Sequence, residues 1–151
     1  MIRLTRLTDY GIVLMSHLAA YGDRRWNAAE LAADTQLPAP TVSKILKLLV
    51  RADLLDSHRG VKGGYSLARS SAEISVVDII DALDGPIALT ECADETGDDC
   101  SYEAVCRVKT NWQRINQVVK EALSQVTLEE MSERTPGVML GGAQELITLG
   151  R

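Results

Sequence analysis

The sequence of 151 residues lacks the signatures of several large protein classes. It contains no phosphate-binding loop, no nucleophile and base pair, and no metal-hydrolase motif, so we do not expect an enzyme. No run approaches the roughly 18 apolar residues that a membrane-spanning helix needs. The early apolar stretch is interrupted by His17 and followed by no small-residue cleavage site, which argues against export. These absences predict a cytoplasmic protein with no membrane partner and no small-molecule substrate.

Aromatic residues and cysteine are scarce. The chain has no Phe, two Trp, four Tyr and only three Cys, whereas its 46% hydrophobic and 25% charged residues are ordinary for a globular protein. An odd number of cysteines in a reducing compartment does not favour structural disulfides. The three cysteines therefore need another explanation.

Charge is divided unevenly along the chain. Residues 1–70 carry ten Lys and Arg against six Asp and Glu, a balance of +4, and residues 71–151 carry six against fifteen, a balance of -9. The overall charge of -5 argues against nucleic acid as a partner of the whole surface. The first part alone is compatible with a polyanion such as DNA.

Apolar spacing and capping residues predict three helices in the first part. Apolar residues recur every three or four positions over residues 4–22, with Thr5 as N-cap. A capping box from Asn27 to Glu30 opens a second helix over 28–35. Two prolines at 38 and 40 then break the chain, and Pro40 can begin a third helix over 40–52.

Two short extended segments, 54–58 and 65–68, enclose a glycine-rich turn. Helix, tight break, helix with a basic face and glycine-rich hairpin form the order of a winged helix-turn-helix, so the predicted fold class is mainly α with a small β-wing. A recognition helix reads base edges in the major groove, and a basic wing reaches phosphates or the minor groove. The predicted DNA contacts are Thr41, Ser43 and Lys44 on the third helix and Arg59, Lys62, Gly63, Gly64 and Tyr65 in the wing. For any one of them, a solvated helix face or a simple turn is the better explanation; their order in one segment favours DNA.

The second part predicts a short helix over 76–83 capped by Ser75, an acidic loop, and a long helix. Apolar residues spaced by three and four from Val105 to Val126 form a seam that needs a partner helix, which predicts a homodimer. The expected division is a DNA-binding domain over 1–72, a connecting helix over 73–90, a cysteine loop over 91–107, a dimerisation helix region over 108–130 and a flexible tail over 131–151.

The three cysteines, Cys92, Cys100 and Cys106, are separated by seven and five residues. Zinc sites usually contain closely spaced cysteine pairs and a fourth ligand, so zinc matches poorly. Thiolates spread over a loop suit an iron-sulfur cluster, of 2Fe-2S or 4Fe-4S type. Nearby acidic residues disfavour free thiolates, and a bound metal offsets that effect. Three unliganded, buried cysteines are the plain alternative.

Several segments together resemble the IscR and NsrR group of Rrf-type winged-helix regulators. The matching parts are the opening ten residues, the wing 59–67, the segment 78–85 and the three cysteines, within about residues 1–130. The resemblance implies a homodimer that crosses through the long helix and an iron-sulfur cluster that governs operator binding. It is strongest to regulators of SUF-type assembly operons, which implies a repressor of cluster assembly genes.

The fourth cluster ligand departs from the IscR pattern, which has a His where this chain has Lys109. The NsrR-like opening implies Asp9, from the partner subunit, as that ligand; a carboxylate favoured by the helix dipole explains Asp9 nearly as well. His17 and His58 are assigned no metal role. The alternatives are a nitric-oxide or redox-sensing repressor of the same family and, from another class, a small iron-sulfur electron-transfer or carrier protein.

Overall fold

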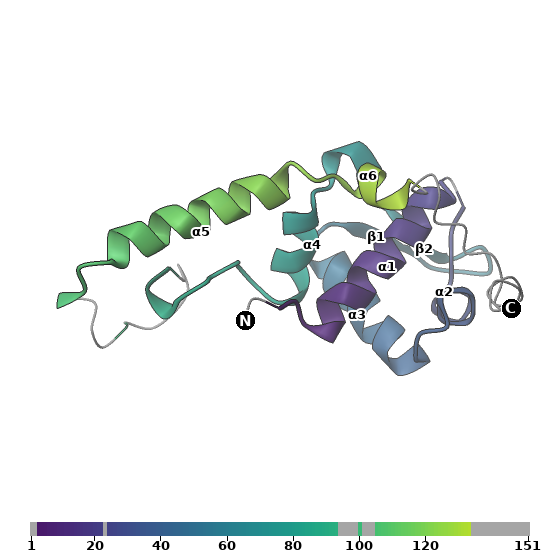
Figure 1. The fold of residues 1–151 in the computed structure, drawn as a ribbon. Helices are drawn as coiled ribbons and strands as arrows, with labels where there is room; N and C mark the ends of the chain where they lie inside the picture. The colour runs from purple at the N-terminus through teal and green to yellow at the C-terminus, as the bar shows by residue number, and fades with distance from the viewer. Residues whose placement is uncertain (1–2, 23, 94–99, 101–104, 134–151) are drawn as a thin grey trace, which may run out of the picture.

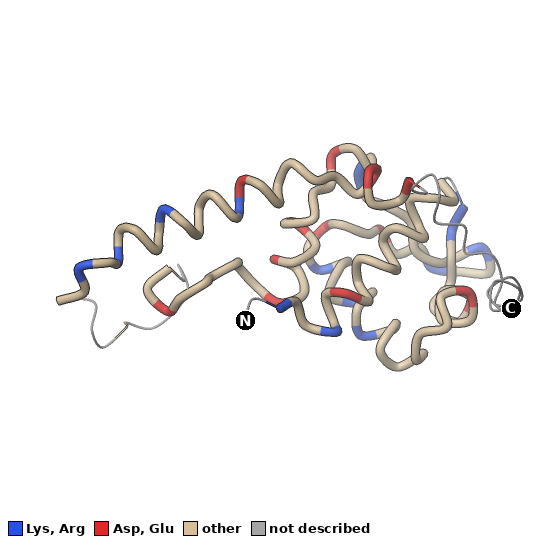
Figure 2. Tube along the Cα trace, viewed as in Figure 1, with Lys and Arg blue, Asp and Glu red and all other residues tan. Residues whose placement is uncertain are grey.

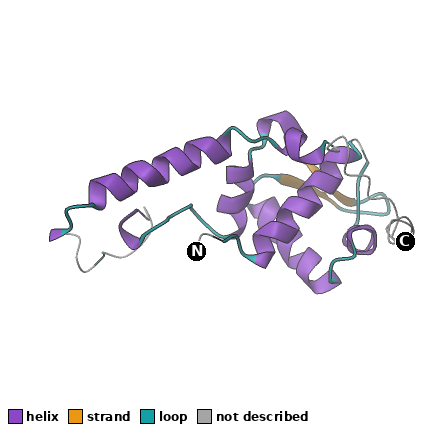
Figure 3. Cartoon of the chain, viewed as in Figure 1, coloured by secondary structure: helices purple, strands orange, loops and turns teal. Residues whose placement is uncertain are grey.

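A computed structural model describes residues 3–22, 24–93, 100 and 105–133 (Figure 1). The elements are α1 (Arg6–Ala20), α2 (Ala28–Thr35), α3 (Ala39–Arg51), β1 (Leu55–His58), β2 (Gly64–Leu67), the 3-10 turn η1 (Ser71–Glu73), α4 (Val76–Leu83), the 3-10 turn η2 (Glu91–Ala93), α5 (Lys109–Ser124) and α6 (Leu128–Ser132). Most of these elements are helices, and the two strands form one small antiparallel sheet (Figure 3). This arrangement confirms the predicted fold class.

Helices α1, α2 and α4 begin where capping side chains accept hydrogen bonds from free N–H groups. The Thr5 hydroxyl accepts from the Thr8 N–H, and Asn27 and Glu30 form the expected capping box of α2. Ser75 caps α4 in the same way with Asp78. The three predicted helix starts are therefore confirmed, and local sequence alone positions them.

The core lies between α1, α3 and α4. Leu14, Ile45 and Ile79 are fully buried within it. Gly11 lies where α1 crosses α4, and a side chain there would overlap Leu83. The absence of a side chain thus permits the close packing that fixes α1 against the other two helices.

The wing is a two-stranded hairpin with Leu55 opposite Leu67 and His58 opposite Gly64. Trp26 extends it as a bridge partner of Tyr65. The Trp26 N–H donates to the Tyr65 carbonyl at 3.0 Å, and the Tyr65 N–H returns a bond of 2.7 Å. The segment before α2 therefore fixes the wing to the helical core.

The end of the long helix differs from the sequence expectation. The apolar spacing runs to Val126, but α5 ends at Ser124, and a capping box of Thr127 and Glu130 begins the separate helix α6. α6 packs on α1, and Leu128 is fully buried in the winged-helix core. Its N–H donates to the Ile74 carbonyl at 2.7 Å.

The S/T-x-x-E pattern at 127–130 was visible in the sequence. The apolar spacing of three and four continues to Val126, beyond the end of α5 at Ser124, and so does not reveal the break. Helix α6 also includes the first two residues of the predicted tail, and residues 134–151 lie outside the described residues.

Helix α5 extends away from the rest of the molecule (Figure 1). Within the part of the chain that the structure describes, no helix combines the length and apolar character needed to cross a membrane. The fold therefore has two parts, which we call the winged-helix unit (residues 3–83 with α6) and the arm (residues 87–93 and 105–124).

Candidate DNA-binding surface and cysteine site

Helix α3 has the two faces that its sequence predicts. Val42, Ile45, Leu46 and Leu49 are fully buried. Lys44 is exposed, whereas Thr41 and Ser43 are half-buried beside it in the first turns. The left-handed backbone of Gln36, with φ of 55°, turns the chain between α2 and α3. These three predicted base-reading residues thus lie in the first turns of α3, with Lys44 the most exposed of them.

The wing presents Arg59 and Lys62 to solvent at its turn. Figure 2 shows Lys and Arg near the wing, and others along the arm as well. Two cationic side chains held on one hairpin suit the polyanionic backbone of DNA. The wing and the start of α3 remain the predicted DNA contacts.

The wing glycines have an explanation within the fold as well. A side chain at Gly63 would lie 2.5 Å from the His58 carbonyl oxygen, and one at Gly64, where φ is +143°, would lie 2.8 Å from the Trp26 carbonyl oxygen. Both contacts are too short for a real side chain. Gly63 and Gly64 are therefore required to close the wing, independently of any approach to DNA.

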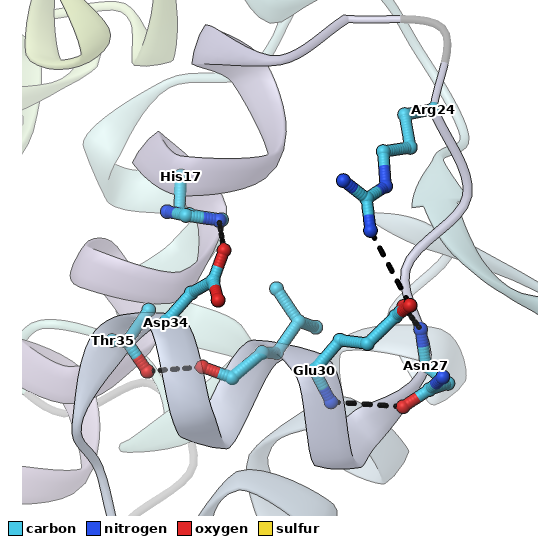
Figure 4. A network of polar contacts seen from close by, with 7 residues as sticks. His17, Arg24, Asn27, Glu30, Asp34 and Thr35 are labelled. Carbon is cyan, nitrogen blue, oxygen red and sulfur yellow. Dashed lines mark hydrogen bonds and ion pairs between the residues drawn. The ribbon is translucent and has the colours of Figure 1, made fainter.

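Sequence reasoning missed Arg25 as a neighbour of the wing. Its guanidinium donates to the Lys62 carbonyl at 3.5 Å. The adjacent Arg24 stacks on the Trp26 ring, 3.8 Å from its centroid, and pairs with Glu30 at 3.3 Å (Figure 4). In the sequence, the only sign of this contact is the pair of arginines before Trp26. Their closeness to the wing depends on the bridge between Trp26 and Tyr65, which the sequence does not reveal.

His17 connects α1 to α2 rather than to a metal. Its Nε2 lies 3.7 Å from the Asp34 carboxylate (Figure 4), and its ring packs edge-on against Trp26 at 4.7 Å. Burial lowers the pKa of His17, and the charge of Asp34 opposes that shift. This agrees with its expected packing role. His58 contacts the Ser66 hydroxyl at 3.0 Å in the wing.

The three cysteines are free and half-buried. Cys92 lies in η2, which packs on α5, and its Sγ is 3.3 Å from the Thr90 hydroxyl. Cys106 lies three residues before α5 begins. The segment carrying Cys92 and the helix that follows Cys106 are thereby brought together, and Cys100 lies between them in the sequence.

Among the described residues, no three His, Cys, Asp or Glu are grouped closely enough to hold a metal ion. Asp9 is exposed on α1 and lines a shallow depression with Arg3, Thr5, Arg6 and Tyr10. The donor set nevertheless fits an iron-sulfur cluster, because three soft thiols, none of them in a disulfide, lie close together in the sequence and the first is in η2, which packs on α5.

The outer side of α5 is apolar and uncovered. Trp112 and Ile115 are 39% and 45% exposed, and Val108 is 49% exposed one turn earlier. They follow the predicted spacing of three and four. A single chain leaves this face in water, as expected for a helix that pairs with another helix.

Comparison with known proteins agrees with this architecture. The model of the Rrf2 family, described as an iron-dependent transcriptional regulator, matches residues 4–134. Protein aau3 of Rhizobium meliloti strain 1021 is 26% identical over 137 residues, which cover 91% of this chain and 89% of aau3.

Two solved structures are similar in fold. CymR of B. subtilis, the global cysteine regulator, gives a TM-score of 0.68 at 30% identity, covering 87% of this chain and 97% of CymR. IscR of T. potens gives a TM-score of 0.62 at 27% identity, covering 86% and 85%. The electron-carrier and enzyme classes find no support in this family. The chain belongs to the Rrf2 family of DNA-binding winged-helix transcriptional regulators.

Proposed function

We propose that this Rrf2-family regulator is a homodimeric repressor of iron-sulfur cluster assembly genes whose operator affinity depends on a cluster held by Cys92, Cys100 and Cys106. The observation that carries the proposal is the contact of η2 with α5, which brings the segment of Cys92 against the helix that follows Cys106. Likeness to IscR supports the same assignment. Asp9 of a partner subunit is the proposed fourth ligand, since it is exposed on α1 and within reach of a second chain.

The chain divides the work between its two parts. Thr41, Ser43 and Lys44 read bases, and Arg59, Lys62 and the backbone of Gly63, Gly64 and Tyr65 contact the DNA backbone. The apolar face of α5 pairs with its counterpart in a second copy. Two recognition helices must then match half-sites about 34 to 36 Å apart, so the direction of α5 sets operator affinity.

A bound cluster would supply a centre that can be gained, lost or oxidised as the cell's iron and sulfide supply changes. The protein's part is mechanical. Cys92 and Cys106, when held to one centre, fix residues 87–93 along the first turns of α5. Helix α5 packs on α4, which packs on α3, so the direction of α5 is transmitted to the recognition helix.

The test is DNA binding by the anaerobically prepared protein in cluster-loaded and metal-free forms. The DNA is the sequence that the loaded protein selects from a random pool. We expect a coloured protein containing iron and sulfide, and at least about tenfold weaker binding after cluster removal, a difference of about 1.4 kcal/mol. Cys92→Ala should behave like the metal-free form under all conditions.

Protein that stays colourless and iron-poor after iron and sulfide are supplied would contradict the proposal. Equal DNA affinity of loaded and metal-free protein would contradict the coupling alone. The likeness to CymR, a cysteine regulator, favours a second candidate: a repressor that responds to redox state through its thiols without metal. That candidate predicts colourless protein whose DNA affinity changes when the thiols are oxidised.

A further inference from the structure

Asn116 is an unusual residue on α5. The structure describes all 16 residues of this helix, and Asn116 is the only one that is buried. It is 6% exposed, while the adjacent Ile115 on the apolar face is 45% exposed. A polar side chain is thus the most buried part of an otherwise solvated helix. Burying an amide is unfavourable unless its hydrogen-bonding groups are satisfied.

Both ends of the Asn116 amide are satisfied by one short backbone segment. Its Oδ1 accepts from the Leu89 N–H at 3.0 Å, and its Nδ2 donates to the Ile87 carbonyl at 2.9 Å. Only one orientation of the amide makes both bonds, because an N–H cannot accept and a carbonyl cannot donate. The side chain therefore hydrogen-bonds to the backbone of residues 87 and 89 and fixes two groups that lie 29 and 27 residues away in sequence.

The anchored segment leads directly to a cysteine. Thr90 follows Leu89; its carbonyl accepts from the Ala93 N–H at 2.9 Å, closing η2, and its hydroxyl lies 3.3 Å from the Cys92 Sγ. Figure 1 shows this segment running beside α5 in the opposite direction, toward the end where the helix begins. Cys92 is thus directed toward the end of α5 that follows Cys106.

We infer that Asn116 is a positioning residue of the cysteine site. Its two hydrogen bonds, which we call the lock, hold the segment before Cys92 on α5 and so link this thiol to the helix that carries the apolar pairing face. The role of the lock in holding a cluster rests on the proposed function; the lock itself does not. Asn116 makes no contact with the thiols and acts only through Ile87, Leu89 and Thr90.

The test compares three variants with the wild type. Asn116→Ala removes both bonds, and Asn116→Asp keeps an acceptor for Leu89 but has no donor for Ile87. Asn111→Ala is the matched control, because Asn111 is an exposed asparagine on the same helix. Circular dichroism checks that each variant retains its helices.

Two measurements are made on each protein. In metal-free protein, hydrogen exchange of the Leu89 amide should be faster on the order of tenfold in Asn116→Ala, the usual effect of losing a buried hydrogen bond, and much less affected in Asn116→Asp. In reconstituted protein, EDTA should remove iron several-fold faster from Asn116→Ala, with Asn116→Asp intermediate. Asn111→Ala should match the wild type in both.

The inference is overturned if Asn116→Ala keeps wild-type exchange at Leu89, or if Asn111→Ala changes either measurement as much. If Asn116→Ala loses helix content, Asn116→Asp is used instead. Iron release from Asn116→Asp that is no faster than from the wild type would then overturn the inference. Failure of the proposed function is distinguishable: wild-type protein would then take up no iron, while hydrogen exchange at Leu89 would still reveal the lock. Faster exchange with unchanged iron release would contradict a role at the cysteine site.

Discussion

The winged-helix unit and the arm are built by different rules. The unit encloses fully buried residues such as Leu14 and Ile45, and its helices α1, α2, α4 and α6 start at side-chain caps. In the arm, by contrast, apolar residues of α5 are exposed to solvent and the one buried residue of the helix is an asparagine. The unit is therefore complete as one chain, whereas the arm has the surface of an element that becomes complete on association. A change of state at the cysteine site in the arm therefore need not unfold the winged-helix unit.

The sharpest test of this contrast is Leu128→Ala, because α6 follows the arm in sequence but belongs to the unit. Removing a fully buried leucine should lower the free energy of unfolding by about 2 to 5 kcal/mol. The control Met131→Ala, at a 43% exposed position of the same helix, should change it by no more than about 0.5 kcal/mol. Chemical denaturation measures both, and equal effects would place α6 outside the core.

Ile115→Asp tests the other half of the contrast. A charge on the exposed apolar face should weaken self-association by at least about tenfold, or about 1.4 kcal/mol, since it would be buried between helices. Sedimentation at several protein concentrations measures the association. Gln113→Asp adds the same charge on the opposite side of α5 and should associate like the wild type. Identical behaviour of the two variants would show that this face does not pair.

Features set by interactions between residues close in sequence could be predicted, and features set by distant residues could not. Caps act within three residues, so the starts of α1, α2 and α4 could be read from Thr5, Asn27 and Ser75. The return of Leu128 to the core could not, because a spacing of three and four does not reveal where a helix breaks. The lock by Asn116 was equally hidden, since it joins groups 27 and 29 residues apart.

Lys44→Ala examines whether the unit alone reads DNA. If Lys44 contacts a base, its loss should reduce discrimination against one altered position by about 1 to 3 kcal/mol; if it contacts phosphate, the salt dependence should fall by about one unit of slope. Fluorescence anisotropy over a salt series distinguishes the two. Lys120→Ala, on α5, should change neither. An effect of Lys120 as large as that of Lys44 would extend the DNA surface into the arm.

The smallest expected effect concerns acid stability, which the unit should show through His17. Burial keeps the pKa of His17 below its usual 6.5, so as pH falls through 6.5 the unfolded chain takes up a proton before the folded one does. The free energy of unfolding is therefore highest above this pH, declines below it, and levels off once the folded state is protonated too. His17→Gln should remove this part of the decline.

Asp34→Asn provides the opposing control, because the Asp34 charge raises the pKa of His17 against the effect of burial. Removing that charge should lower the pKa of His17 further and steepen the loss of stability in acid. An NMR titration, with His58→Gln to assign the two imidazoles, reports the pKa directly. A His17 that titrates above 6.5 would reverse the sign of the argument, and would mean that pairing with Asp34 at 3.7 Å outweighs burial against Trp26.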